Sequence, residues 1–397
     1  MENIMDPLPR LQDYVRRPTF TPVKLGKRFK QTDQVFVRAM RGELGEDMAK
    51  VNITTPPPHP LDRTVFSPNM VRALLWPGCE AKVHEYKVPI SDKKKMSSHI
   101  KEVAKEFGAD LVGITYLHQA FVFENDRGGE PINLTHEYAI VMAKEMNYQK
   151  IATSPSWYDH FEVGKTYHDV TVLGVHLANY IGQLGYRARA SVVGNDTVVH
   201  VPLAVYAGLG EYSRMGRVIT KEYGPRVRLC TVTTDLPLEI DHPVDFNVEH
   251  FCEICRKCAI NCPGQSIPLG NEKVEIRGFL KWDENGDDCY RFWRKKPYKW
   301  QACSRCIAVC PWNKPHNLFH KFVATLAIEF TWIHKLLLFF DDLFYGKKPK
   351  IRDQPAAYED YMMKEVDYWQ MVESTSAEQA LLTAKSISRT KSEKLKT

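Results

Sequence analysis

The sequence predicts an α+β protein of two or three domains, in which an α/β core precedes a cysteine-rich module. Three observations support this fold class. The chain has 397 residues, which is too many for one ordinary domain. Between residues 93 and 245 the apolar residues alternate between the spacing typical of helices and that typical of strands. Eight of the ten cysteines lie between Cys252 and Cys310.

The overall composition is that of a folded globular protein, with 44% hydrophobic and 26% charged residues. The formal net charge of +6 is small for this length and is spread along the chain, so it does not indicate nucleic-acid binding. Cys79 and Cys230 lie outside the cysteine-rich stretch and are expected to be ordinary buried thiols.

The elements can be placed from the pattern of apolar residues and turn formers. Residues 1–60 are polar, end in a proline-rich run and are expected to form an extended arm or linker. Helices are expected at residues 97–107, closed by Gly108, and at residues 166–185. Strands are expected at residues 109–114, 138–142, 198–201 and 227–233, with a glycine-rich loop at residues 207–216.

The chain is expected to become aromatic and helical after Pro311. The apolar stretch at residues 322–340 is interrupted by Glu329, His334 and Lys335, so an amphipathic or buried helix is expected rather than a membrane span. The tail from about residue 375 is rich in lysine and serine and is expected to fray.

The first cysteine run has the spacing of a bacterial ferredoxin. Cys252, Cys255, Cys258 and Cys262 follow the pattern C-x2-C-x2-C-x3-C, with Pro263 next. In such a run three thiolates bind one cube and the fourth reaches the other cube. A zinc site usually has two C-x-x-C pairs and no third cysteine in register. The run therefore indicates [4Fe–4S] clusters.

The second run is incomplete. Cys303, Cys306 and Cys310 keep the last three positions, but Trp300 stands where the first cysteine would fall. Because two cubes need eight thiolates, Cys289 is the nearby candidate for the missing ligand. We expect Cys252, Cys255, Cys258 and Cys310 on one cube, and Cys262, Cys289, Cys303 and Cys306 on the other. The alternative is a free Cys289 and a second cube with three cysteine ligands.

About 250 residues precede these cysteines, and an electron carrier alone would not need them, so a redox-active centre is expected upstream. The sequence around Gly208 and Gly210 lacks the third glycine of a G-x-G-x-x-G motif, and neither a P-loop nor an H-E-x-x-H motif occurs. Nicotinamide and nucleotide chemistry therefore lack support. No D-x-H-x-x-G motif, which supplies a histidine to cobalt in many corrinoid proteins, occurs either.

Several motifs resemble those of the corrinoid-dependent reductive dehalogenases of organohalide respiration. They are AGLGEYSRMG at residues 207–216, IT at 219–220, YGPRVR at 223–228, TDLPL at 234–238, PVDF at 243–246 and CIAVCPWNK at 306–314. Upstream, SPS at 154–156, VGKTY at 163–167, LGY at 184–186 and GND at 194–196 also fit. The resemblance covers about residues 95–350, and nothing in residues 1–90 matches.

The resemblance implies a nitroreductase-like α/β corrinoid-binding core and a ferredoxin-like module with two [4Fe–4S] clusters. We expect an N-terminal variable region at residues 1–92, the core at 93–245, the cluster module at 246–320 and a helical extension at 321–397. It also implies that electrons pass through the two cubes to a corrinoid cobalt, which reductively removes halide from an organohalide. The corrinoid would have no histidine ligand from a D-x-H-x-x-G motif.

The resemblance also implies three catalytic residues. Tyr167 matches the proton-donating tyrosine of the family, and Arg228 matches a cation that stabilises the phenolate. Asn195 matches a polar residue near the substrate. Taken singly, the three are compatible with a packed tyrosine, a paired arginine and a turn asparagine.

Further residues are weaker candidates. Trp293 matches a family aromatic that lines the substrate pocket, although packing near a cluster is an equal alternative. Candidates for corrinoid contacts, each of which could equally serve a turn, are Gly210, Ser213, Gly216 and Thr220.

The nearest alternative is an epoxyqueuosine reductase-like enzyme that acts on tRNA, and a non-catalytic iron–sulfur electron-transfer subunit is a second. The dehalogenase resemblance implies a small halogenated substrate, a small membrane-anchor subunit, a low-potential electron donor and no nucleic acid, with a homodimer left open. No N-terminal signal is recognised. We expect a mature form at the outer face of the cytoplasmic membrane after twin-arginine export, with a cytoplasmic location as the alternative.

Overall fold

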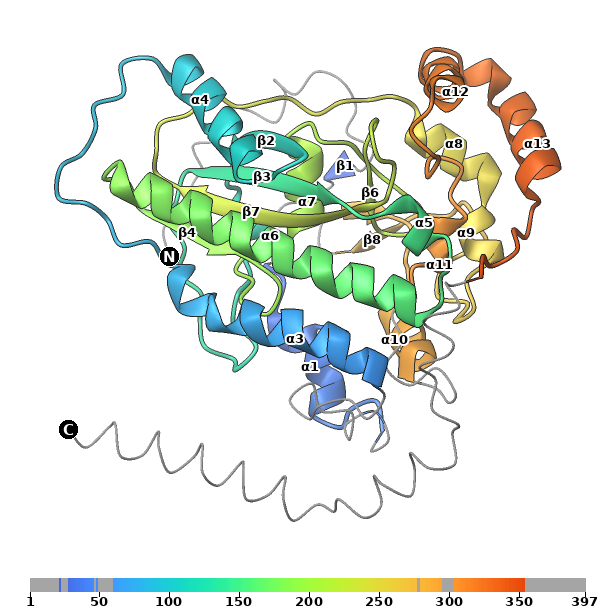
Figure 1. Cartoon of the computed structure of the whole chain (residues 1–397), viewed down its shortest axis with the longest axis horizontal. Helices are drawn as coiled ribbons and strands as arrows, with labels where there is room; N and C mark the ends of the chain where they lie inside the picture. The colour runs from blue at the N-terminus through green and yellow to red at the C-terminus, as the bar shows by residue number, and fades with distance from the viewer. Residues whose placement is uncertain are drawn as a thin grey trace.

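The computed structural model describes residues 21–22, 28–45, 48, 60–276, 279–294 and 303–353 (Figure 1). Its centre is a four-stranded antiparallel sheet in the order β2-β3-β7-β4. The strands are β2 (Leu111–Tyr116), β3 (Tyr138–Glu145), β7 (Val227–Thr234) and β4 (Ala188–Ser191). The α+β class expected from the sequence is therefore confirmed.

Alternate residues of β3 supply two separate cores because successive strand residues point to opposite faces. Ile140 and Met142 pack against α4 (Lys93–Glu106) and the long helix α6 (Trp157–Gln183). Ala139 and Val141 pack on the other face, against α7 (His200–Tyr206). Helix α3 (Pro60–Leu74) covers the outer side of α6 (Figure 1).

The cysteine-rich region lies at one end of this core. It contains α8 (Val248–Cys255), α9 (Lys257–Ile260), α10 (Gly286–Arg294) and α11 (Arg305–Ala308). β8 (Val274–Ile276) and β9 (Phe279–Lys281) join β1 (Thr21–Pro22) in a three-stranded sheet. The short elements α1 (Val35–Met40) and α10 pack against each other, and α5 (Tyr148–Ile151) contacts α11.

The two expected helices are present but begin earlier than the sequence predicted. A side-chain oxygen of Asp92 accepts a hydrogen bond from Lys95 N and caps α4, which ends before Gly108 at φ +105°. Ser156 caps α6 in the same way, so that α6 begins at Trp157, nine residues upstream of the expected start at residue 166. Apolar periodicity located the buried parts of both helices, and the caps set where they begin.

The expected strand at residues 198–201 is wrong. Val198 makes one isolated bridge with Val122, and α7 begins at His200. Three valines in four residues (Val198, Val199 and Val201) did not distinguish a strand from the start of a buried helix. The glycine-rich loop at residues 207–216 also needs correction, because β5 (Glu211–Tyr212) pairs with β6 (Val218–Ile219) to make a hairpin.

The apolar stretch at residues 322–340 is not one helix. It belongs to α12 (Leu318–Glu329) and α13 (His334–Tyr345), which are joined by a 3-10 turn and bent by 115°. Among the described residues no single helix is long and apolar enough to cross a membrane, and this bent pair passes that test by length and composition only. Pro60, the last residue of the proline-rich run, begins α3, whereas residues 56–59, Trp300 and the tail from residue 375 lie outside the described residues.

Candidate redox site

The four cysteines expected on the first cube surround one small cavity. Cys252, Cys255, Cys258 and Cys310 all line it, together with apolar residues and Arg256. Arg256 adopts a left-handed conformation (φ +54°) between α8 and α9. This residue separates Cys255 from Cys258 and turns the chain, so that cysteines from two helices line the same cavity. The structure thus brings together the set that the spacing predicts for one cube.

The second set is also brought together, and Cys289 is part of it. Ser266 lies within hydrogen-bonding distance of Cys262 Sγ through both its Oγ (3.2 Å) and its backbone N (3.3 Å). Burial raises the pKa of Cys289, the nearby Cys262 raises it further, and Ser266 counteracts the shift. Cys289 is also near Cys303 and Cys306, because its charge contributes to raising the pKa of both. This placement favours Cys289 as the eighth ligand over a free thiol.

The chemistry of these cysteines fits iron–sulfur clusters. All ten cysteines are free of disulfides. Burial raises the pKa of Cys252 to about 12 and that of Cys306 to about 11, so each needs a positive partner to become a thiolate. Within the described ranges no three His, Cys, Asp or Glu side chains come close enough to hold a single metal ion. Two sets of four cysteines match the ligand number of two [4Fe–4S] clusters.

Tyr167 and Arg228 are in contact, although 60 residues separate them in the chain. The guanidinium carbon of Arg228 at the start of β7 lies 4.8 Å from the centre of the Tyr167 ring on α6. Nε of Arg228 is buried and has no hydrogen-bond partner among the described residues. A cation at this distance stabilises a phenolate and a bound anion alike.

Asn195 is held by other groups. Its Oδ1 accepts a hydrogen bond from Arg189 Nη2 (2.8 Å), and its Nδ2 donates to the carbonyl oxygen of Trp76 (3.3 Å). Gly194 precedes it at φ +92°, where an added Cβ would lie 2.2 Å from the Trp76 ring. No described contact joins Asn195 to Tyr167 or Arg228.

Two further arginines near Tyr167 were not predicted from the sequence. Burial lowers the pKa of Arg72 on α3, whereas Tyr167 and Asp196 act in the opposite direction and therefore lie near it. The side chain of Arg217 is exposed, and the nearby Cys306, Tyr167 and Cys289 raise its pKa. Arg217 thus lies near both Tyr167 and the second cysteine set. Arg217 directly follows one of the family motifs, whereas Arg72 lies where no motif gave a signal.

The weaker candidates make structural contacts. Gly210 leaves room for Ile219 O, Ser213 Oγ donates to Arg217 O (2.7 Å), and Thr220 Oγ1 donates to Gly224 O (3.1 Å). Gly216 adopts φ +69° beside Glu284. These contacts are the turn roles that the sequence left as alternatives, and the corrinoid contacts stay predictions.

Trp293 lies on α10 at the edge of this region. Its ring packs 5.8 Å from that of Phe36 on α1, and its Nε1 is buried without a partner among the described residues. Packing is therefore one of its roles, and a place in the substrate pocket stays a prediction.

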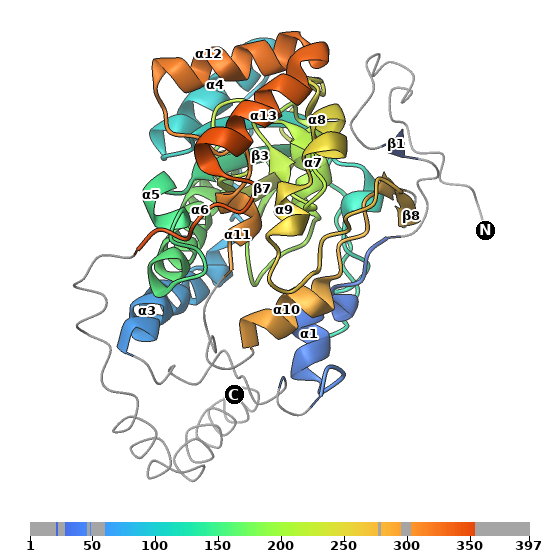
Figure 2. The ribbon, with the colours of Figure 1, turned by 90° about the vertical axis from the view of Figure 1, so that its right-hand side faces the viewer.

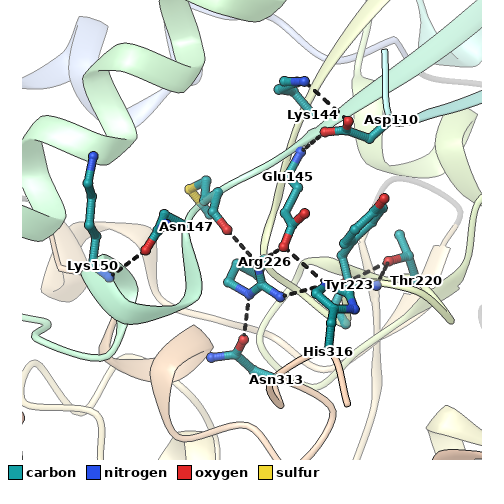
Figure 3. Close-up of polar contacts among 12 residues, drawn as sticks. Asp110, Lys144, Glu145, Asn147, Lys150, Thr220, Tyr223, Arg226, Asn313 and His316 are labelled. Atoms are coloured by element: carbon teal, nitrogen blue, oxygen red, sulfur yellow. Dashed lines mark hydrogen bonds and ion pairs between the residues drawn. The ribbon is translucent and has the colours of Figure 1, made fainter. Parts of the chain in front are cut away.

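Two buried arginines tie the cysteine loops to the core. Arg214 donates to Cys252 O (3.1 Å) and lies 4.8 Å above the Trp282 ring. Arg226 is fully buried and joins Glu145 and Met146 O, at the end of β3, to Asn313 Oδ1 (2.8 Å; Figure 3). The backbone N of Asn313 donates to Cys310 O (2.8 Å). The loop that follows Cys310 is thereby fixed to the central sheet.

Two buried acids lie beside the same loops. Burial raises the pKa of Glu211 to about 7, although the carboxylate accepts hydrogen bonds from Phe246 N and Val248 N. Burial likewise raises the pKa of Asp159 to about 7, and Ser154 and Ser304 counteract the shift. Asp159 accepts a hydrogen bond from Ser304 N (3.2 Å), next to Cys303.

Comparison with known proteins defines the class first. No protein-family model matches the chain. Two solved structures of a catabolic reductive dehalogenase, NpRdhA, superpose with a TM-score of 0.78, cover 85% of this chain and 49% of theirs, and are 28–29% identical. One of them is a complex with 3-bromo-4-hydroxybenzoic acid.

Curated relatives agree with this class. The tetrachloroethene reductive dehalogenase of Desulfitobacterium hafniense is 37% identical over 247 residues, which is 59% of this chain and 43% of the relative. That of Sulfurospirillum multivorans is 32% identical over 302 residues, 66% of this chain and 59% of the relative. The epoxyqueuosine reductase of Vibrio cholerae is 26% identical over 260 residues, 56% of this chain and 68% of the relative.

The chain is therefore related in sequence and fold to the reductive dehalogenases, as its motifs predicted. It spans about half the length of these two curated dehalogenases.

Proposed function

We propose that this chain is the catalytic subunit of a corrinoid-dependent reductive dehalogenase. The observation that carries the proposal is the Tyr167–Arg228 pair, linked through Arg217 to the second of two four-cysteine sets. A nitroreductase-like core and a ferredoxin-like module with two [4Fe–4S] clusters are the finer architecture that we infer. The domain limits at residues 93, 246 and 321 belong to this proposal.

Each group has a defined task in this proposal. The thiolates of Cys252, Cys255, Cys258 and Cys310 would hold one cube and those of Cys262, Cys289, Cys303 and Cys306 the other, and the two cubes would supply electrons to the site. The second cube is the one near Tyr167, because Arg217 lies close to Cys289, Cys306 and Tyr167. A bound corrinoid supplies the low-valent cobalt that cleaves the carbon–halogen bond. Overall, two electrons and one proton convert the carbon–halogen bond into a carbon–hydrogen bond and release halide.

Tyr167 supplies the proton, and its phenol oxygen becomes a phenolate in that step. Arg228 stabilises this phenolate because its positive charge lies against the ring. Asn195 positions the substrate from the turn that Arg189 and Trp76 hold. Three buried donors have no hydrogen-bond partner in the described part of the chain: Nε of Arg72, Nε of Arg228 and Nε1 of Trp293. They are available to polar groups of the corrinoid or the substrate.

Corrinoid contacts from Gly210, Ser213, Gly216 and Thr220 and the absence of a D-x-H-x-x-G histidine ligand remain part of the proposal. A small membrane-anchor subunit, a low-potential donor, a location at the outer face of the cytoplasmic membrane and a homodimer are proposed from the family resemblance alone. The alternative location is the cytoplasm. A tRNA-modifying enzyme has weaker support, since the dehalogenases match at higher identity.

The test uses anaerobically purified protein reconstituted with iron, sulfide and a corrinoid and supplied with a low-potential electron donor. We expect about eight iron atoms and one corrinoid per chain, and halide release from chlorinated or brominated alkenes or phenols. If a loaded protein released no halide from any of these substrates, the proposed activity would be refuted. Loss of epoxide from a modified tRNA would support the alternative enzyme, and failure to bind any corrinoid would support an electron-transfer subunit.

A further inference from the structure

Helix α13 has its charged side turned toward the protein. Asp341 and Asp342 form ion pairs with the fully buried Lys257 of α9, and Asp341 also pairs with Lys314 (2.5 Å). His334, at the start of the helix, is buried and bonded to Ala327 O (2.7 Å). These contacts fix the orientation of α13 on the cysteine module, since turning the helix would leave Lys257 buried without a partner.

The apolar side of the same helix therefore faces outward. Leu336, Phe339, Phe340, Leu343 and Phe344 recur at the three- and four-residue spacing of one helical face, and they are 42–72% exposed. Trp332, just before the helix, is 81% exposed. This arrangement is the reverse of that of an ordinary surface helix, whose apolar side faces the core.

Helix α12 extends this apolar surface. Its first turns expose Leu318, Phe319 and Phe322 to between 61% and 85%. Both helices lie at one end of the molecule, outside α8 and α9, in two perpendicular views (Figures 1 and 2). We call this surface the α12–α13 face, and its members are Leu318, Phe319, Phe322, Trp332, Leu336, Phe339, Phe340, Leu343 and Phe344. Monomeric soluble proteins seldom expose so many large apolar side chains together, so the face is suited to a nonaqueous surface.

The charges around this face complement an anionic surface. Lys321, Lys335, Lys347, Lys348 and Lys350 are exposed along the two helices and the segment that follows. Glu329 is the one exposed acidic residue of α12 and α13, because Asp341 and Asp342 are engaged by lysines. Exposed lysines beside phenylalanine, leucine and tryptophan are typical of helices that lie in the headgroup region of a bilayer.

The geometry favours lying on a bilayer over crossing it. Each helix has 12 residues and is therefore about 18 Å long, shorter than the roughly 30 Å of the hydrocarbon core. The bend of 115° between them excludes one continuous span.

We propose that the α12–α13 face binds directly to an anionic lipid surface, with both helices lying in the plane of the interface. This binding is independent of the proposed dehalogenase activity.

The proposal has a consequence for the path of electrons. A groove of about 850 Å³ lies under the two helices, and Phe251, Pro311 and Trp312 line both this groove and the cavity of the first cysteine set. Binding through the α12–α13 face would therefore turn the first cysteine set toward the membrane.

The test is vesicle flotation of the full chain, purified anaerobically with its cofactors. Vesicles of phosphatidylcholine alone are compared with vesicles that contain phosphatidylglycerol, at low and high salt. We expect binding to the anionic vesicles that weakens with salt. The variant Trp332→Ser/Phe339→Ser/Phe344→Ser should bind about tenfold more weakly or worse, because its largest exposed rings are removed.

The matched control is Leu74→Ser/Tyr86→Ser/Leu269→Ser, which removes three side chains of similar exposure (56–75%) far from the face and should bind like the unaltered chain. Equal binding of both triple variants would overturn the proposal, as would absence of the unaltered chain from all floated vesicles. Light scattering supplies a second readout. If the unaltered chain were a dimer that did not bind vesicles, and the Trp332→Ser/Phe339→Ser/Phe344→Ser variant were a monomer, the proposal would be overturned. A second copy of the chain would then cover the α12–α13 face instead of lipid.

Discussion

Replacing Arg226 with methionine is expected to loosen the joint between the central sheet and the loop after Cys310. Methionine keeps much of the length of the side chain but removes the guanidinium that serves Glu145, Met146 O and Asn313 (Figure 3). Breaking a fully buried ion pair costs about 3–5 kcal/mol. Since the Glu145 side chain is 29% exposed and water can partly solvate it, we expect the lower end, about 3 kcal/mol.

The assay is thermal unfolding of the reconstituted protein under nitrogen at one fixed scan rate. A loss of about 3 kcal/mol corresponds to a fall in the midpoint of about 6–12 °C for chains of 150–250 residues, and slightly less for this longer chain. Arg187→Met is the matched control, because Arg187 pairs with Asp235 at the surface, with its side chain 57% exposed, and should lose at most about 1 kcal/mol. Equal shifts in the two variants would refute the reasoning that Arg226 is a buried joint.

Three other predictions test the site. Tyr167→Phe should keep its iron and corrinoid but lose about 10²–10⁴-fold in halide release, and an unchanged rate would exclude Tyr167 as the proton donor. Cys289→Ser should lose up to about half of the bound iron while Cys79→Ala keeps all of it, and full iron in both would leave Cys289 a free thiol. Glu211 has a raised pKa of about 7 in the folded chain, so its contribution to stability is present below pH about 4.5 and is lost as the pH rises through about 7. Glu211→Gln should therefore reduce the fall in the unfolding midpoint between pH 5 and pH 8, and an unchanged pH profile would show that Glu211 does not titrate in this range.

Local patterns predicted most of the central sheet. β2, β3 and β7 appear close to where apolar runs indicated them, because a strand buried on both faces needs an uninterrupted apolar sequence. β4 (ARAS) gave no such signal, since its apolar residues are small alanines. The strand expected at residues 198–201 was wrong because three valines in four residues fit a strand and a buried helix equally well.

The candidate site was likewise only partly predictable from the sequence. The motif around Tyr167 and the one around Arg228 each pointed to a residue, but only the pairing of helix α6 with β7 brings the two side chains within 4.8 Å. Arg72 could not be found from a motif, because its relevance comes from the packing of α3 on α6.

The sequence by itself was enough to identify the two cysteine runs. Their spacings are short, and the turns that such spacings require are local and need no other part of the fold. The sequence also determined the reductive dehalogenase relationship, which rests on motifs written in consecutive residues. Only the tertiary structure brings Cys289 near Cys262, Cys303 and Cys306, because α10 and the turn at Ser266 must meet first. Only the tertiary structure showed that α13 turns its apolar side outward. The sequence of that helix is amphipathic in either orientation, and the buried Lys257 selects the one in which Asp341 and Asp342 face the protein.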